Sequence, residues 1–138
     1  MISLSRRYQF AAAHVLRQPS LSDADNERIY GKCANPSGHG HNYGLEVTIA
    51  GPVNPDTGRI IEPERLDEIV RHRVLERFDH SMLNQDSLFQ GVVPTAENIA
   101  TVVHRRLEGA FTDPEGARLL RVRIVETGRN HFDCGEMP

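Results

Sequence analysis

The chain has 138 residues and a formal net charge of −3. This length allows one domain with a single core, which we expect to span residues 1–138. Because phosphate groups attract clustered Lys and Arg, the absence of a basic run argues against a nucleic-acid partner. No apolar stretch is long enough to cross a bilayer, and the first residues lack the apolar segment of a signal peptide. We therefore expect a cytoplasmic protein with no membrane partner, whose Cys33 and Cys134 are free thiols.

The first half of the chain predicts two paired strands. Residues 3–15 alternate as a β-strand does, and His14 is in phase with Phe10. Residues 17–32 contain Pro, Ser and Asp without sustained periodicity, so we expect a long irregular loop there. Residues 43–51 alternate again and should pair antiparallel with the first strand.

The second half adds two helices and two further strands. Apolar residues at helical spacing predict one helix over residues 62–78 and another from Thr95, whose side chain can cap the free amides of a helix start. Residues 119–127 return to alternation, and residues 130–134 can add a short last strand. This order of elements indicates an α+β domain, an antiparallel sheet with helices on one face. Its open sheet edges favour an oligomer that pairs them.

A pair of histidines follows the predicted loop. His39 and His41 are two positions apart in an extended segment, so both imidazoles point to the same side. His14, at the end of the first strand, is the best candidate for a third nitrogen. Neutral imidazoles suit Zn²⁺, and three protein ligands leave a fourth position open for a water or a substrate oxygen. The alternative is that these are ordinary surface or hydrogen-bonded core histidines. Three further histidines lack comparable neighbours and are expected as ordinary surface or helix residues: His72, His104 and His131.

Six segments carry a more specific signal when they are taken together: Phe10-Ala11-Ala12-Ala13-His14, Gly31-Lys32-Cys33, Gly38-His39-Gly40-His41-Asn42-Tyr43, Asp79-His80, Pro94-Thr95-Ala96-Glu97-Asn98 and Val125-Glu126-Thr127. Jointly they resemble the 6-pyruvoyltetrahydropterin synthase family, which also contains the 6-carboxytetrahydropterin synthases of the queuosine route. The resemblance implies the tunnelling fold (T-fold), in which each subunit gives a four-stranded antiparallel sheet with two helices on one face. It also implies that trimers close a barrel, and that two trimers stack into a homohexamer with active sites at the subunit interfaces.

The resemblance further implies an activity. It makes His14, His39 and His41 the ligands of a Zn²⁺ ion, in agreement with their spacing. The family's reaction is that of a lyase of tetrahydrobiopterin biosynthesis, which converts 7,8-dihydroneopterin triphosphate to 6-pyruvoyltetrahydropterin with release of triphosphate. Because zinc has no redox chemistry of its own, its expected part is to hold and polarise the side-chain hydroxyl oxygens of the substrate.

Further residues match family positions that have chemical roles. Cys33 matches the catalytic cysteine, whose thiolate would abstract a proton; the alternatives are an inert buried thiol or a fourth zinc ligand that closes the site. Asp79 and His80 match a proton-relay pair, although Asp79 could merely close the end of the preceding helix. Glu126 matches the pterin anchor, because its two oxygens can accept two parallel N–H donors. Weaker pterin contacts are assigned to Thr95 and Thr127.

Several alternatives stay open. Five residues separate Cys33 from His39, which resembles the pyruvoyl-forming enzymes, whereas the carboxy-forming enzymes more often show three. A 6-carboxytetrahydropterin synthase of queuosine biosynthesis would nevertheless use the same substrate and metal, releasing acetaldehyde and triphosphate. A zinc hydrolase is disfavoured because the sequence contains no H-E-x-x-H helix. The non-enzyme alternative is a module that only binds zinc or pterin, which an assay of triphosphate release would distinguish.

Overall fold

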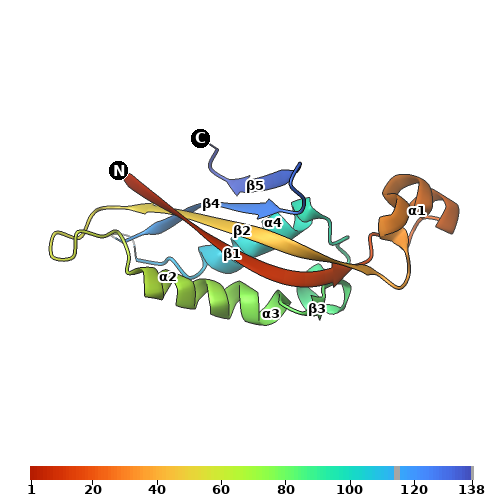
Figure 1. Cartoon of the computed structure of the whole chain (residues 1–138), viewed down its shortest axis with the longest axis horizontal. Helices are drawn as coiled ribbons and strands as arrows, with labels where there is room; N and C mark the ends of the chain where they lie inside the picture. The colour runs from red at the N-terminus through yellow and green to blue at the C-terminus, as the bar shows by residue number, and fades with distance from the viewer. Residues whose placement is uncertain (114–115, 138) are drawn as a thin grey trace.

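One five-stranded sheet organises the molecule (Figure 1). The computed structural model describes residues 1–113 and 116–137. The strands are β1 Ile2–His14, β2 His39–Gly51, β3 Ser81–Met82, β4 Arg118–Val125 and β5 His131–Gly135. They lie in the order β3-β1-β2-β4-β5, and the pairs β1–β2, β2–β4 and β4–β5 are antiparallel, whereas β3 runs parallel to β1. The sheet is therefore mixed.

The four predicted strands are present and pair antiparallel. The prediction of a four-stranded antiparallel sheet is wrong for the sheet as a whole, because a fifth strand, β3, pairs parallel with β1. The difference comes from one short segment. The Asp79 carboxylate accepts a hydrogen bond from the Ala11 N–H at 2.8 Å, and the His80 N–H donates to the Ala11 carbonyl. These bonds hold the chain against the outer edge of β1, so that Ser81–Met82 pairs with residues 12–13. Two residues are too few to give a recognisable strand pattern.

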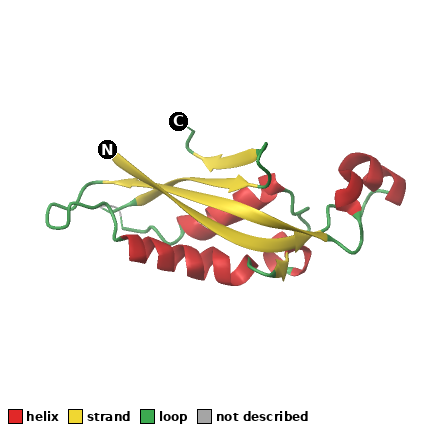
Figure 2. Ribbon diagram, in the orientation of Figure 1, coloured by secondary structure: helices red, strands yellow, loops and turns green. Residues whose placement is uncertain are grey.

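Two helical runs cover one face of the sheet, as predicted (Figure 2). Their parts are α2 Pro63–Val70, a π-helical turn Arg71–Leu75 and α3 Glu76–Phe78 in the first run, and α4 Ala96–Glu108 in the second. Thr95 begins α4 as the predicted cap, because its hydroxyl oxygen accepts a hydrogen bond from the Asn98 N–H at 3.2 Å. Alternate residues of three strands are buried on the helix side: Phe10, Ala12, Tyr43, Leu45, Val47, Ile49, Val122 and Ile124.

The segment between β1 and β2 is not the irregular loop that its polar sequence predicts. It contains helix α1, Asp23–Tyr30, followed by a 3-10 turn, Gly31–Ala34. The fully buried Asn26 ties the segment together, because its Oδ1 accepts from the Gln18 N–H at 2.8 Å and its Nδ2 donates to backbone carbonyls of the same segment. Hydrophobic periodicity could not reveal α1, since only one of its residues is buried and that residue is polar. Figure 1 shows α1 standing off one end of the sheet.

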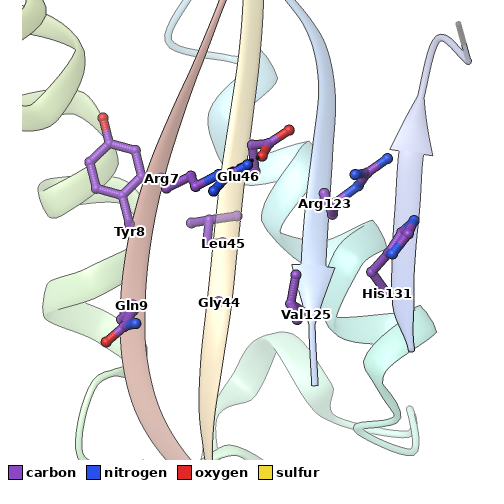
Figure 3. Close-up of a pocket in the computed structure, with 9 residues that line it drawn as sticks. All are labelled: Arg7, Tyr8, Gln9, Gly44, Leu45, Glu46, Arg123, Val125 and His131. Atoms are coloured by element: carbon purple, nitrogen blue, oxygen red, sulfur yellow. Dashed lines mark hydrogen bonds and ion pairs between the residues drawn. The ribbon is translucent and has the colours of Figure 1, made fainter. Parts of the chain in front are cut away.

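The face of the sheet away from the core is polar. Arg7 pairs with Glu46 across β1 and β2, with 3.1 Å between Nε and Oε2, and Arg123 pairs with Asp133 across β4 and β5 at 2.7 Å. Figure 3 shows Arg7, Glu46 and Arg123 together with His131 around a hollow of about 590 Å³. Because these charges already have partners on neighbouring strands, we interpret this face as a row of cross-strand ion pairs.

Candidate metal centre and active site

Three histidines converge at one end of the β1–β2 pair. The antiparallel register places His14 opposite His39, and Ala12 opposite His41, so all three imidazoles lie on the helix side of the sheet. The Nε2 atoms of His14 and His39 are 3.0 Å apart. One ring nitrogen from each histidine lies within 4.8 Å of the others, and the ring centroids are 4.5 to 5.0 Å apart. The structure thus brings together the three histidines that the sequence singled out.

The protein surroundings favour the neutral form of His14 and His39. Burial is the main cause that lowers the pKa of His14 to about 4, and burial also lowers the pKa of His39. Nδ1 of His14 lies 2.8 Å from the Pro94 carbonyl, which can only accept, so Nδ1 carries the hydrogen and Nε2 presents its lone pair. The buried Nε2 of His41 has no hydrogen-bond partner within the described ranges. Converging imidazole nitrogens, one of them buried without a partner, are the donor set that Zn²⁺ prefers, so these residues fit the ion.

Cys33 is held close to the end of β1. The Leu16 N–H donates to the Cys33 carbonyl at 2.7 Å, which fixes the 3-10 turn after α1 beside the strand that carries His14. The side chain is half-buried, and burial, followed by the negative charge of Glu126, raises the pKa of the thiol. Protein groups alone therefore favour the neutral thiol over the thiolate. A dication at the histidines would act in the opposite direction.

Glu126 lies on the same side of the site. It follows β4 directly, and because Val125 pairs with Gly44, the next residue along comes beside Tyr43. The Glu126 charge raises the pKa values of Cys33 and Tyr43, secondary to burial, and opposes the lowering of the His39 pKa. The half-buried Glu126 is thus near the thiol of Cys33, the His39 ring and the buried phenol of Tyr43.

The two threonines lie in local turns. Thr95 caps α4 and directly follows Pro94, whose carbonyl contacts His14, so this helix start borders the histidine centre. Thr127 is exposed, and its hydroxyl accepts from the Arg129 N–H at 3.2 Å. Both hydroxyls accept a backbone N–H in the protein, and each retains its own hydrogen for a further acceptor.

Asp79 and His80 form a pair at the outer edge of β1. The His80 Nδ1 lies 3.1 Å from Asp79 Oδ2, so the two side chains are within ion-pair distance. The His80 side chain is 83% exposed, and its φ of 60° is in the left-handed region, which costs a non-glycine residue roughly 1 kcal/mol or more. No hydrogen bond or ion pair joins either side chain to Cys33 among the described residues. Within one chain, the structure therefore assembles the pair without grouping it with the thiol.

Comparison with known proteins shows the relationship that this geometry suggests. Residues 3–136 match the family model described as 6-pyruvoyl tetrahydropterin synthase. The chain belongs to the 6-pyruvoyl tetrahydropterin synthase family. The 6-pyruvoyl tetrahydrobiopterin synthase of Drosophila melanogaster is 38% identical over 128 residues, which are 92% of this chain and 75% of that protein. The putative 6-carboxy-5,6,7,8-tetrahydropterin synthase of Archaeoglobus fulgidus is 35% identical over 107 residues, 78% of this chain and 82% of its own length.

The fold agrees with this membership. The solved structure of Caenorhabditis elegans 6-pyruvoyl tetrahydropterin synthase matches this chain with a TM-score of 0.89 and 35% identity, covering 99% of this chain and 96% of that one. The mixed five-stranded sheet with its two covering helical runs is thus a fold of the synthase family, and the resemblance found in the sequence is confirmed.

Two residues of this synthase-family site were not singled out by the sequence. Tyr43 contacts His14, and it could have been found, because it continues the alternation of His39 and His41 along β2. The Pro94 carbonyl also contacts His14, and no side-chain pattern can reveal a backbone acceptor supplied from a distant part of the chain.

Proposed function

We propose that this member of the synthase family is a zinc-dependent lyase that converts 7,8-dihydroneopterin triphosphate to 6-pyruvoyltetrahydropterin and triphosphate. The observation that carries the proposal is the convergence of the imidazoles of His14, His39 and His41 near Cys33 and Glu126. The membership of the family gives this cluster its expected chemistry. We also expect the protein to be cytoplasmic; none of the described helices is long and apolar enough to span a bilayer.

The metal and the thiol have separate tasks in the proposed reaction. A Zn²⁺ ion held by His14, His39 and His41 would polarise the hydroxyl oxygens of the substrate side chain and make the neighbouring C–H groups more acidic. Cys33 acts as the base that removes such a proton, which requires its thiolate form. We favour this role over that of a fourth ligand, because a closed site leaves no position for substrate.

Glu126 is proposed to bind the pterin ring. Its two carboxylate oxygens match the parallel donors at the 2-amino group and N3, which places the side chain of the pterin near the histidines. Thr95 and Thr127 can add hydrogen bonds to the ring from their hydroxyl hydrogens. The half-buried position of Glu126, near Cys33, supports a role in the site rather than that of a solvated strand end.

Asp79 and His80 are proposed as the proton relay, acting on the Cys33 of a neighbouring subunit. The Asp79 carboxylate lies beside Nδ1 of the His80 ring, and this exposed ring can exchange protons with a group outside its own chain. This requires the homohexamer that the T-fold implies, a dimer of trimers in which each trimer closes a barrel and active sites lie at the subunit interfaces. In support, no described strand pairs with the outer edge of β5, or with the outer edge of β1 apart from residues 12–13.

The carboxy-forming reaction is the second candidate and is less favoured. The relative of that class in Archaeoglobus fulgidus matches a smaller share of this chain than the Drosophila melanogaster synthase does. The spacing of Cys33 and His39 points the same way.

One assay tests the proposed reaction. The zinc-loaded protein is incubated with 7,8-dihydroneopterin triphosphate, and the pterin product and free triphosphate are measured by mass spectrometry. We expect the mass of the pyruvoyl product. The carboxy mass with acetaldehyde would assign the protein to the second candidate, and binding of substrate without triphosphate release would leave only the binding module.

A further inference from the structure

The buried hydroxyl of Tyr43 contacts the histidine centre but has no part in the proposed reaction. Tyr43 is 0% exposed and follows His39 and His41 on the same face of β2. Its hydroxyl oxygen lies 3.1 Å from Nδ1 of His14. The Tyr43 ring stacks on Phe10, with centroids 5.2 Å apart and planes inclined by 23°. This packing gives the phenol oxygen a fixed position beside the imidazole.

The partners of His14 Nδ1 decide the direction of this hydrogen bond. The Pro94 carbonyl, 2.8 Å from the same nitrogen, can only accept. Nδ1 therefore carries the hydrogen, and the Tyr43 oxygen is a second acceptor of that N–H in a three-centre bond. The two acceptors come from different parts of the fold, since Pro94 precedes α4 and Tyr43 belongs to β2. Together they fix both the tautomer and the orientation of the imidazole.

We propose that Tyr43 is a positioning residue of the metal centre, whose hydroxyl oxygen holds the Nδ1–H of His14 so that Nε2 is aimed at the ion. The inference rests on the proposed metal site. Metal-binding histidines usually donate their second ring N–H to an oxygen, and loss of that partner typically weakens metal binding about 10- to 100-fold. Because the Pro94 carbonyl remains in a variant of Tyr43, we expect the lower end of this range.

Tyr43→Phe tests the proposal with the loss of one oxygen, because the ring that stacks on Phe10 is kept. Metal-free wild type and variant are titrated with Co²⁺, whose visible absorption reports the coordination geometry, and the affinity is measured by competition with a chelator. The expected result is an affinity about tenfold weaker in Tyr43→Phe. Tyr8→Phe is the matched control, since it removes a hydroxyl that donates to Asp67 at 2.7 Å, and it should leave the affinity unchanged.

The outcomes separate this inference from the proposed function. Equal affinity in wild type and Tyr43→Phe overturns the role of Tyr43 and leaves the metal site intact, whereas failure of wild type to bind Co²⁺ overturns both. An equal loss of Co²⁺ affinity in Tyr8→Phe also overturns the role of Tyr43, because it indicates a general loosening of the strands. NMR of the zinc-loaded wild type needs no variant: a hydrogen on His14 Nδ1 that lies close to the Tyr43 ring is expected, and a metal-facing Nδ1 contradicts the proposal.

Discussion

Burial shifts the pKa values of single residues in the site more than neighbouring charges do. Burial lowers the pKa of His14 to about 4 and raises the pKa of Cys33, so both residues are neutral in the protein alone. A neutral imidazole is the form that binds a metal, whereas a neutral thiol is not the form that removes a proton. His14 is therefore in the form that binds an ion, whereas the proposed role of Cys33 as a base would require a nearby cation.

This dependence gives a prediction for Cys33→Ala. The variant should keep one zinc per chain, because its three imidazoles are unchanged, and its turnover should fall about 10²- to 10⁴-fold through loss of the base. Elemental analysis and mass spectrometry of the product measure the two quantities. Cys134→Ala is the control, since Cys134 is a half-buried thiol on β5 and should be dispensable for turnover. Normal turnover in Cys33→Ala would refute the base, and loss of its zinc would indicate a fourth ligand.

Glu126→Gln addresses the pterin anchor. The amide keeps the size of the side chain but replaces one acceptor oxygen by an NH₂ group that opposes a ring N–H. A hydrogen bond to a charged group is worth about 1.5–3 kcal/mol, so kcat/KM should fall roughly 10- to 100-fold while metal content stays constant. Steady-state kinetics measure the change, with Glu64→Gln on α2 as the control. Unchanged kinetics in Glu126→Gln would mean that the pterin is bound elsewhere.

The helices and strands that could be predicted from the sequence are those with a regular spacing of apolar residues. The four antiparallel strands and both covering helical runs could be predicted, because their alternate or helically spaced residues are buried or, in β5, partly buried. Helix α1 and strand β3 could not, since side chain to backbone hydrogen bonds of Asn26 and Asp79 hold them in place. The same limit applies to the site: the register of His39 and His41 follows from the sequence, whereas the long-range contact of Pro94 does not.

Asn26 should therefore control the position of Cys33. Asn26→Ala removes the four hydrogen bonds that close the segment before the thiol. We expect faster proteolysis within residues 17–34 and a lower turnover with zinc affinity nearly unchanged. Limited proteolysis, kinetics and metal competition measure these effects. Asn54→Ala, in the turn after β2, removes a comparable cap from the Asp56 N–H and should leave turnover intact. If both variants behave alike, α1 has no specific role in placing Cys33.

The pair of Arg77 and Asp86 should make stability depend on pH. Arg77 at the end of the first helical run donates to both oxygens of Asp86, at 2.9 and 2.7 Å. Burial would raise the pKa of Asp86, but hydrogen bonds from Arg77 and from the Leu88 N–H outweigh it, so the pKa is lowered. A lowered carboxylate pKa stabilises the fold above the unfolded value of about 3.9, and this stabilisation is lost as the pH falls through the folded value.

Asp86→Asn should accordingly reduce the free energy of unfolding by about 2 kcal/mol at pH 7. The difference from wild type should be the same at pH 7 and 5 and smaller at pH 3, because below about 3.9 the unfolded chain takes up a proton at Asp86 that the folded carboxylate resists. Urea unfolding at pH 7, 5 and 3 measures it, with Asp56→Asn in an exposed turn as the control. A difference that is constant over this pH range would assign the loss to packing rather than to the ion pair.

The whole molecule divides the proposed catalytic groups between two places. The histidines, Cys33 and Glu126 gather on the helix side of the sheet, whereas Asp79 and His80 lie at the outer edge of β1. The exposed His80 ring lies beside Asp79, and within the described part of the chain no hydrogen bond or ion pair joins it to Cys33. An assembly that pairs the open sheet edges would allow the relay of one subunit to serve the metal centre of another.

Mixing two inactive variants tests this arrangement directly. Cys33→Ala lacks the thiol and His80→Ala lacks the relay, and each alone should be nearly inactive. If one site takes its thiol and its relay from different subunits, refolding the two variants together in equal amounts should restore about a quarter of the sites. Half of the sites receive Cys33, and half of these also receive His80 from the neighbouring subunit. Turnover after co-refolding, compared with each variant refolded alone, measures the recovery, and light scattering checks that the mixture forms the same oligomer. If each site used Cys33 and His80 of a single chain, no mixed oligomer would contain a complete site, and activity would stay at the level of the separate variants.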